Sequence, residues 1–489
     1  MLKSNLVEAI GTFSPKEMKE LGEFVSSPFF NKNKNVIKLF EIIRKYYPSL
    51  DSDKLSKENV YAKLFPGDKY KDSSMRLLMF YLYEVVEKFL AYGRYTKDDI
   101  NYKKNLLGEF NERNMFKEFE KTYEEVMEDM GKISARDERY YMNSFELANA
   151  YFDYMTKVHY DKYDKYMTGD FIERRFNNLT YSYLISFLKF YCVTLNTFHV
   201  LNFKINMELF ENMLGNFNQE LFESAPVINI YYNAAMALLK PDAEEYYFKL
   251  KELILKHEVV LGKENLSDLF INLENYCTRK VRAGKLNFLE EGFNIYKLEL
   301  EKGLYLSNEV MSTAFYTSVV NVGCRLKQHD YVRSFIEKYK DELSPDSRDA
   351  IYNFSVALLE TDLGQFEKAL EFLSKVKTDH LYIKMDVRML QCRLYYELNW
   401  DDSLESLLDA FKRTLANNKL IPDFRKLHYS NFLKYLGRLA AIRHKADELD
   451  LDVLRKQMLE GDNFYHRPWM IGRIEILEKK LSAKTAGHS

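Results

Sequence analysis

A set of apolar and small side chains recurs after 34 residues in the second half of this 489-residue chain. The first copy comprises Phe366, Ala369, Leu370, Leu373 and Val376. The second copy comprises Trp400, Ser403, Leu404, Leu407 and Ala410. A partial copy with Tyr331, Ser334 and Phe335 lies 35 residues before the first. A period of this length is typical of helix pairs that stack into an array. In such an array we expect the small residues to let two helices approach and the aromatic residues to fill the gap to the next pair.

The composition predicts an all-α fold. The chain has only 18 glycines and 9 prolines, where average usage of roughly 7% and 5% would give about 34 and about 24. Few turn-forming residues and no sustained alternation of apolar and polar residues indicate long helices joined by short loops. We divide the chain into an N-terminal helical module (1–95), aromatic-rich helix pairs (96–225), legible repeats (226–445), and C-terminal capping helices with a frayed tail (446–489).

The segment from Ala357 to Glu371 resembles a tetratricopeptide repeat. Ala357 matches the small residue of the first helix, Gly364 the turn glycine, and Phe366 and Ala369 the aromatic and the alanine that open the second helix. The next copy has Cys392 as the small residue, but places Asn399, Trp400 and Ser403 at the turn, aromatic and alanine positions. The resemblance implies a right-handed superhelical array of antiparallel helix pairs, an α-solenoid, in which a groove holds a peptide or a partner helix. Asn353 and Glu360 depart from the family, because large residues usually stand there.

The N-terminal module has clear helix signals. Ser14-Pro15-Lys16-Glu17 predicts a capping box, and the helix it opens must end before Pro28. In the loop that follows, we expect Phe29 and Phe30 to clamp neighbouring helices, with an exposed contact site as the alternative. The stretch Ser26–Lys34, together with Leu64-Phe65-Pro66-Gly67, is similar to large helical proteins of Bacteroidota-type bacteria, a resemblance that implies no activity.

Helical spacing alone explains the many aromatic residues between 140 and 203, and it predicts that they form a wide core. Members of the longest run are Phe171, Phe176, Leu179, Tyr183, Phe187, Phe190 and Tyr191.

The sequence contains no phosphate-binding loop, no nucleophile motif and no pair of histidines at metal-ligand spacing, so we predict no catalytic residue, no cofactor and no metal. The four cysteines are far apart, which favours small core residues in a reducing compartment over disulfides or zinc ligands. We expect a cytoplasmic protein, because the N-terminus lacks an apolar signal segment and no apolar run reaches the roughly 18 residues of a membrane span.

Two functions remain open. The first is a non-catalytic scaffold whose groove is lined by polar residues of the first helices, for which Asn353, Glu360, Arg388 and Lys434 are our candidates. The second is a regulatory binder of nucleic acid or another anionic partner through the basic stretch 425–445, where Arg438 and Arg443 are the candidate contacts. For these two arginines, a structural role at the helix C-terminus is the competing interpretation. A net charge of −2 gives no general preference for nucleic acid. An enzyme whose site is assembled from distant helices is a third, weaker option, and the sequence does not determine the oligomeric state.

Overall fold

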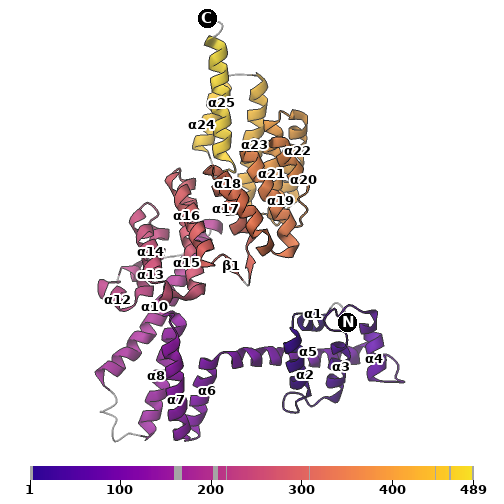
Figure 1. Cartoon of the computed structure of the whole chain (residues 1–489), viewed down its shortest axis with the longest axis vertical. Coiled ribbons are helices and arrows are strands. Elements are labelled where there is room, and N and C mark those ends of the chain that lie inside the picture. The colour runs from indigo at the N-terminus through magenta and orange to yellow at the C-terminus, as the bar shows by residue number, and fades with distance from the viewer. Residues whose placement is uncertain are drawn as a thin grey trace. The chain divides into compact units, whose positions relative to one another are not determined.

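The computed structural model describes residues 4–158, 168–201, 208–215, 217–307, 309–445, 448–461 and 464–486. These residues are helical apart from short connections and one two-stranded hairpin, which confirms the all-α prediction (Figure 1). The chain divides into two compact units. Unit 1 comprises Met1–Ser134 and Glu138–Ser182, and unit 2 comprises Ala135–Asp137 and Tyr183–Ser489. The finer division at residues 95, 225 and 445 stays a prediction.

Unit 1 begins with a small helical core. Its elements are α1 (Asn5–Gly11), α2 (Pro15–Ser26), α3 (Lys34–Arg44), η1 (Asp53–Leu55), α4 (Lys57–Leu64) and α5 (Asp72–Lys97). The α5 helix packs against each of the four α-helices before it, and fully buried side chains such as Leu21, Phe40 and Leu82 fill the space between them.

Local signals set the boundaries of these helices. The Ser14 hydroxyl accepts a hydrogen bond from the Glu17 amide while the Glu17 carboxylate accepts one from the Ser14 amide, which confirms the capping box. The expectation for the two phenylalanines is right for only one. Phe30 stacks on Phe24 with a centroid separation of 3.8 Å, whereas Phe29 is 87% exposed. The Phe29 ring lies edge-on to the Phe30 ring, with centroids 5.0 Å apart, so Phe30 contacts the helix while Phe29 packs on Phe30 alone among these rings and faces solvent.

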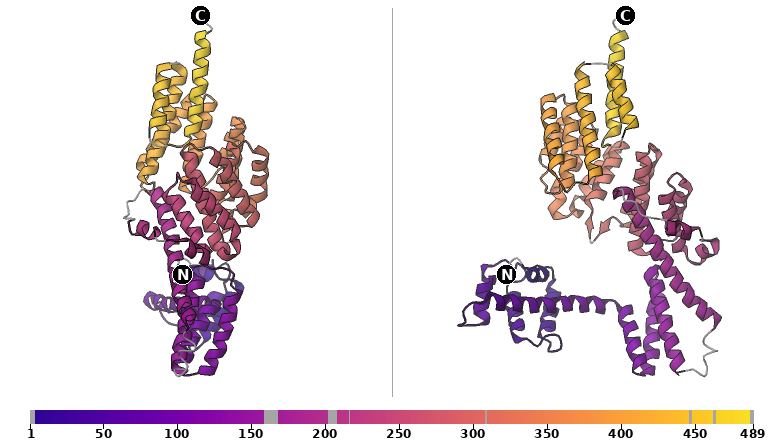
Figure 2. Two further views of the ribbon diagram at one scale, coloured as in Figure 1. Left: turned by 90° about the vertical axis from the view of Figure 1, so that its left-hand side faces the viewer. Right: turned by 180° about the vertical axis from the view of Figure 1, so that it is seen from behind.

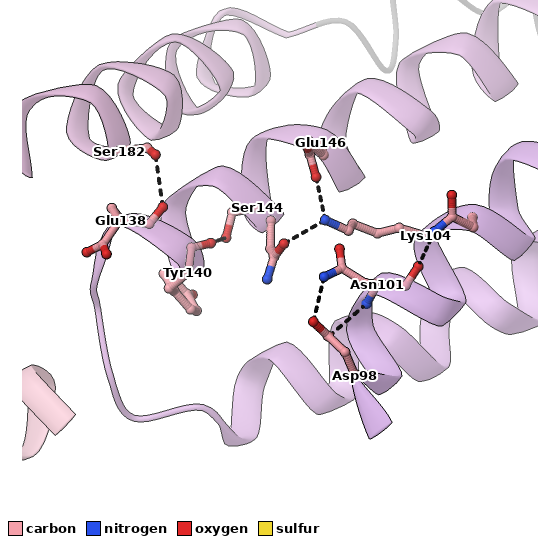
Figure 3. Close-up of polar contacts among 10 residues, drawn as sticks. Asp98, Asn101, Lys104, Glu138, Tyr140, Ser144, Glu146 and Ser182 are labelled. Carbon is pink, nitrogen blue, oxygen red and sulfur yellow. Dashed lines mark hydrogen bonds and ion pairs between the residues drawn. The ribbon is translucent and has the colours of Figure 1, made fainter. Parts of the chain in front are cut away.

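The remainder of unit 1 consists of α6 (Asp99–Glu112), α7 (Phe116–Lys132), α8 (Glu138–Val158) and the first part of α10 (Gly169–Leu201). Polar contacts tie α6 and α10 to α8 (Figure 3). The Lys104 ammonium donates to Asn143 Oδ1 at 2.7 Å and pairs with Glu146, and the Ser182 hydroxyl donates to the Glu138 carbonyl at 2.9 Å. Each contact joins two helices, so together they fix the order of the helices in this part of the unit.

Unit 2 contains the remaining elements. They are the end of α10, α11 (Glu208–Leu214), α12 (Gln219–Ser224), α13 (Pro226–Leu239), α14 (Glu244–Lys256), α15 (Glu258–Arg282), α16 (Asn287–Lys302), β1 (Leu306–Ser307), β2 (Val310–Met311), α17 (Thr313–Arg325), α18 (His329–Tyr339), η3 (Lys340–Glu342), α19 (Pro345–Asp362), α20 (Phe366–Ser374), α21 (Leu381–Glu397), α22 (Asp401–Asn417), α23 (Asp423–Lys445), α24 (Glu448–Glu460) and α25 (Arg467–Ala486). From α12 to α25 each α-helix contacts the next one in sequence. In addition α13 contacts α15, α17 contacts α19, α19 contacts α21, and α23 contacts α25. The helices α19 to α23 therefore lie side by side in chain order (Figures 1 and 2).

A left-handed residue closes the first helix in several of these pairs. These residues are Gly284, Lys327, Gly364 and Asn399, with φ between 58° and 90°. In each case the amide of the following residue donates to a carbonyl five residues before it, at 2.8–2.9 Å. This is the hydrogen bond of a Schellman turn, which satisfies a free carbonyl at the helix end. The pairs thus share one turn geometry, although only two of the four turns use glycine.

The turns correct the predicted register of the repeats. Asn399 lies 35 residues after Gly364, so the residue equivalent to Ala369 is Leu404 and not Ser403. Leu404 is buried, whereas Ser403 and Ser334 are exposed and Trp400 is 47% exposed. The predicted close-contact role therefore holds for Ala369 alone and is wrong for both serines. Trp400 is the residue after the left-handed turn, where its side chain projects outward.

Candidate partner-binding groove

Unit 2 has an open groove of about 1140 Å³ along α21. Its walls come from the start of α19, the connection between α20 and α21, the first half of α21, the end of α22, and the connection between α22 and α23. The lining residues are Asp346, Val376, Lys377, Thr378, Asp379, Leu381, Lys384, Met385, Val387, Arg388, Gln391, Thr414, Asn418 and Leu420. Helical periodicity explains why α21 contributes so many, because residues three or four apart share one face of a helix.

The groove combines an apolar floor with charged walls. Met385 is 2% exposed and forms part of the floor, while Leu420 at one edge is 78% exposed. Lys377, Lys384 and Arg388 supply three cations against the carboxylates of Asp346 and Asp379. The Lys384 ammonium lies 3.0 Å from Asp379 Oδ1. The remaining excess of positive charge suits a ligand that carries a carboxylate.

Of the candidate groove residues predicted from the sequence, Arg388 lines the groove found in the structure. Its Nη1 donates to Thr414 Oγ1 at 2.6 Å, and its guanidinium carbon lies 5.9 Å from the centroid of the Phe411 ring. Contacts with two residues of α22 hold the guanidinium at the wall. An arginine has five N–H donors in a planar fork, so this one bond leaves further donors for a carboxylate.

The structure places Asn353 and Glu360 elsewhere, on α19. The Asn353 amide donates to the Asp349 carbonyl at 2.7 Å along its own helix. Glu360 is only 1% exposed and accepts from Lys368 at 2.9 Å and from Arg333 at 3.4 Å. The departure of Glu360 from the repeat pattern thus has a structural explanation, because this carboxylate bridges α18 and α20.

The basic stretch 425–445 lies on α23, where several cationic groups contact other helices. Arg443 Nη1 donates to the Tyr396 carbonyl at 2.6 Å, its second nitrogen pairs with Asp401, and its guanidinium lies 4.4 Å from the Tyr396 ring centroid. Arg438 donates to Gln457 of α24. Lys434 is exposed, with its ammonium 5.6 Å from the ring centroid of Tyr435. The side chains of His444 and Lys445 lie outside the described part. Arg443 in particular is committed to joining α23 to the turn between α21 and α22.

A buried pair of carboxyl groups escaped the sequence interpretation. Glu299 of α16 is 3% exposed, and its carboxyl hydrogen-bonds that of Glu274 on α15. Burial raises the pKa of both carboxyls, and the shared hydrogen bond requires a proton between them. The signal was present in the sequence: Glu299 shares the apolar face of Gly292 and Tyr296, at helical spacing, rather than a solvated face with lysines.

The cysteine prediction is confirmed where the structure can test it, since Cys192, Cys277, Cys324 and Cys392 are all buried and unbridged. Burial raises the pKa of each thiol to about 12. Within the described ranges, no group of three or more metal-ligating side chains comes together, and no helix has the length and apolar character needed to cross a bilayer.

Comparisons with known proteins give no relative. No family model, no curated protein and no solved structure matches this chain significantly.

Proposed function

We propose that this protein is a non-catalytic interaction scaffold of the tetratricopeptide-like α-solenoid type, and that the groove along α21 holds a segment of a partner protein. The observation that supports this most directly is the groove itself, at about 1140 Å³, with an apolar floor and an arginine positioned at its wall. A cleft of mixed polarity on packed helices is the usual setting for recognition of a peptide or a helix. The ligand would be a segment with apolar side chains and at least one carboxylate.

The contact pattern of unit 2 is also what a right-handed array of antiparallel pairs would produce, because each helix contacts its neighbour and several first helices contact the next first helix. Binding of nucleic acid through 425–445 is the weaker proposal, because Arg438 and Arg443 contact other helices of the fold. A cytoplasmic location remains part of the proposal.

The test is affinity purification of the full chain from its native source, in three forms. We expect the unmodified chain to retain a defined protein, and Arg388→Glu to lose it through repulsion of the partner's carboxylate. The matched control is Lys412→Glu, a change of equal charge at an exposed position of α22 that does not line the groove. Recovery of the bare chain under gentle conditions would contradict a scaffold role, and equal recovery with Arg388→Glu would contradict this groove.

A further inference from the structure

A pair of aromatic side chains lies at the C-terminal end of α21, beyond the groove. Trp400, the residue after the left-handed turn at Asn399, is 47% exposed. Its ring lies 5.6 Å from the ring of Tyr395, centroid to centroid, at an angle of 39°. Among the described residues no other ring packs on Trp400, and none accepts a hydrogen bond from its indole N–H. The other tryptophan, Trp469, donates its indole N–H to Glu397 at 2.6 Å. The ring face and the N–H donor of Trp400 are therefore both open to a ligand.

One side chain joins this aromatic pair to the groove. Gln391 lines the groove, and its Nε2 donates to the Tyr395 hydroxyl at 2.7 Å. Tyr395 is one turn farther along α21 than Gln391, and long side chains of a helix lean toward the preceding turn. The surface therefore continues from Arg388 through Gln391 to Tyr395 and Trp400, and all of it belongs to unit 2.

The groove end of this surface suits a carboxylate. Lys377, Lys384 and Arg388 line it against the carboxylates of Asp346 and Asp379. Asp379 is already paired with Lys384 at 3.0 Å. The Arg388 guanidinium donates one hydrogen bond, to Thr414, and its fork has further donors. An incoming carboxylate would thus find a positioned arginine with donors to spare.

We propose that this continuous surface binds an extended, proline-containing segment of a partner protein, with a carboxylate of the segment at Arg388 and a proline ring on the indole of Trp400. The inference rests on the proposed function of the groove and names the class of segment that the groove holds. Proline-rich segments dock on aromatic side chains, and their polyproline II backbone forms no internal hydrogen bonds. A free carbonyl of such a segment can therefore accept from the Trp400 N–H. A lysine side chain on the indole is the competing occupant, which the exposed Asp402 would favour, but an ammonium offers no acceptor for this N–H.

The helix sets the spacing of the two contacts. Arg388 and Tyr395 are seven residues apart on α21, which is about 10 Å at 1.5 Å per residue. A polyproline II segment rises about 3.1 Å per residue, so about three residues separate the carboxylate from the proline. The length of the two charged side chains extends this range to roughly three to five residues.

The experiment is titration calorimetry of the full chain with synthetic peptides capped at both ends. Each peptide has two adjacent prolines and an aspartate about four residues away, with alanine elsewhere, and the aspartate is placed before the prolines in one peptide and after them in the other. We expect at least one order to bind with a Kd on the order of 10–100 μM. Replacing the prolines by alanines or by lysines should weaken binding about tenfold or more. Tryptophan emission should change on binding, because Trp400 is exposed in the free chain.

Arg388→Glu and Trp400→Ala should each weaken binding of the proline peptide by about tenfold or more, since arginine and tryptophan dominate such contacts. Arg388→Glu should prefer the peptide in which lysine replaces the aspartate, whereas the unmodified chain should prefer the aspartate. Phe248→Ala, at a position 50% exposed on α14, is the matched control and should bind like the unmodified chain. Circular dichroism should show unchanged folding for all three variants.

Failure of both peptide orders, tighter binding of the peptide with lysines in place of prolines, undiminished binding by Trp400→Ala, or an Arg388→Glu variant without the reversed preference would each overturn this inference. Affinity purification separates its failure from that of the proposed function. A partner protein that is lost with Arg388→Glu but retained with Trp400→Ala would leave the groove as the binding site and refute the proline contact. A partner retained by both variants would refute the groove as well.

Discussion

Replacement of Glu299 by glutamine should stabilise unit 2 at neutral pH. The Glu299 carboxyl is 3% exposed and hydrogen-bonds Glu274. Tyr296 of the same helix and Cys277 of α15 lie close to this pair. Burial of the carboxyl is the largest cause of its raised pKa, and the neighbouring Glu274 raises it further. A glutamine has the same shape, carries no charge at any pH, and can donate the hydrogen bond that the shared proton now provides.

The size of the effect follows from proton linkage. The ordinary pKa of a glutamate here is 4.5, so Glu299 of the unfolded chain releases its proton near that pH while the folded chain retains it. Folding then binds a proton, and stability falls as the pH rises from 4.5 toward the raised pKa of the folded state. Between pH 4.5 and pH 7 the folded state loses about 1.4 kcal/mol of stability per pH unit over about 2.5 units, or roughly 3 kcal/mol in all. Glu299→Gln removes this loss, so its advantage should vanish near pH 4.5 and reach up to about 3 kcal/mol at pH 7.

Tryptophan fluorescence can measure this selectively. The chain has two tryptophans, Trp400 and Trp469, and both lie in unit 2 with the glutamate pair. Urea unfolding at a series of pH values should give curves for the two proteins that separate as the pH rises. Glu301→Gln is the control, because Glu301 is exposed on the same helix. Parallel pH profiles for the unmodified chain and Glu299→Gln would refute the assignment of a shared, buried proton.

Three further predictions concern the helix pairs of unit 2, and circular dichroism during urea unfolding can check each one. Leu404→Ala should cost about 2–5 kcal/mol because the side chain is 1% exposed, whereas Trp400→Ala should cost clearly less; equal costs would contradict the corrected register. Lys327→Gly should stabilise the protein by about 0.5–1 kcal/mol, because glycine adopts the left-handed conformation at φ 58° without strain. Gly364→Ala, at φ 75°, should destabilise it by about 1 kcal/mol for the same reason. The reverse signs would refute a common turn geometry. Arg443→Met should cost about 1–3 kcal/mol of stability through loss of the contacts with Asp401 and Tyr396. Lys434→Met, at an exposed position, is the control and should change stability by less than about 0.5 kcal/mol. An Arg443 variant as stable as the unmodified chain would favour a binding role for this side chain instead.

The features that could be predicted from the sequence are those determined within one or two turns of helix. The all-α class follows from composition, and the capping box at Ser14 follows from four adjacent residues. The burial of the four cysteines is likewise a property of residue type. In each case the physical cause acts locally, so no knowledge of distant helices was needed.

Helical spacing could not decide which apolar face is covered. The residues of α10 repeat at three or four positions on both faces, yet Leu188 is completely buried while Phe190 is 63% exposed. The difference arises from the helices that pack on α10 within unit 2, where Cys192 lies against α13 and Lys189 donates to Asn265 of α15. The predicted core role of Phe190 is therefore wrong. The groove has the same origin: Arg388 lines it because α22 presents Thr414 opposite, a juxtaposition across 26 residues.

The turns between paired helices show why a fixed period is a poor guide to the packing of unit 2. The left-handed turn residues Gly284, Lys327, Gly364 and Asn399 are separated by 43, 37 and 35 residues. Measured from each turn, however, the fifth residue is always buried, as is the ninth. The buried fifth and ninth residues are Leu289, Val332, Ala369 and Leu404, and Phe293, Ile336, Leu373 and Leu408. Packing therefore fixes the distance from the turn to the core of the second helix, because a shift of one residue rotates every side chain by about 100°. The connection between pairs is under no such constraint, since doubling a loop costs only about 0.6 kcal/mol. Helix pairs built this way keep their internal geometry while the spacing of their turns drifts, and a turn at lysine or asparagine is missed by a search that expects glycine.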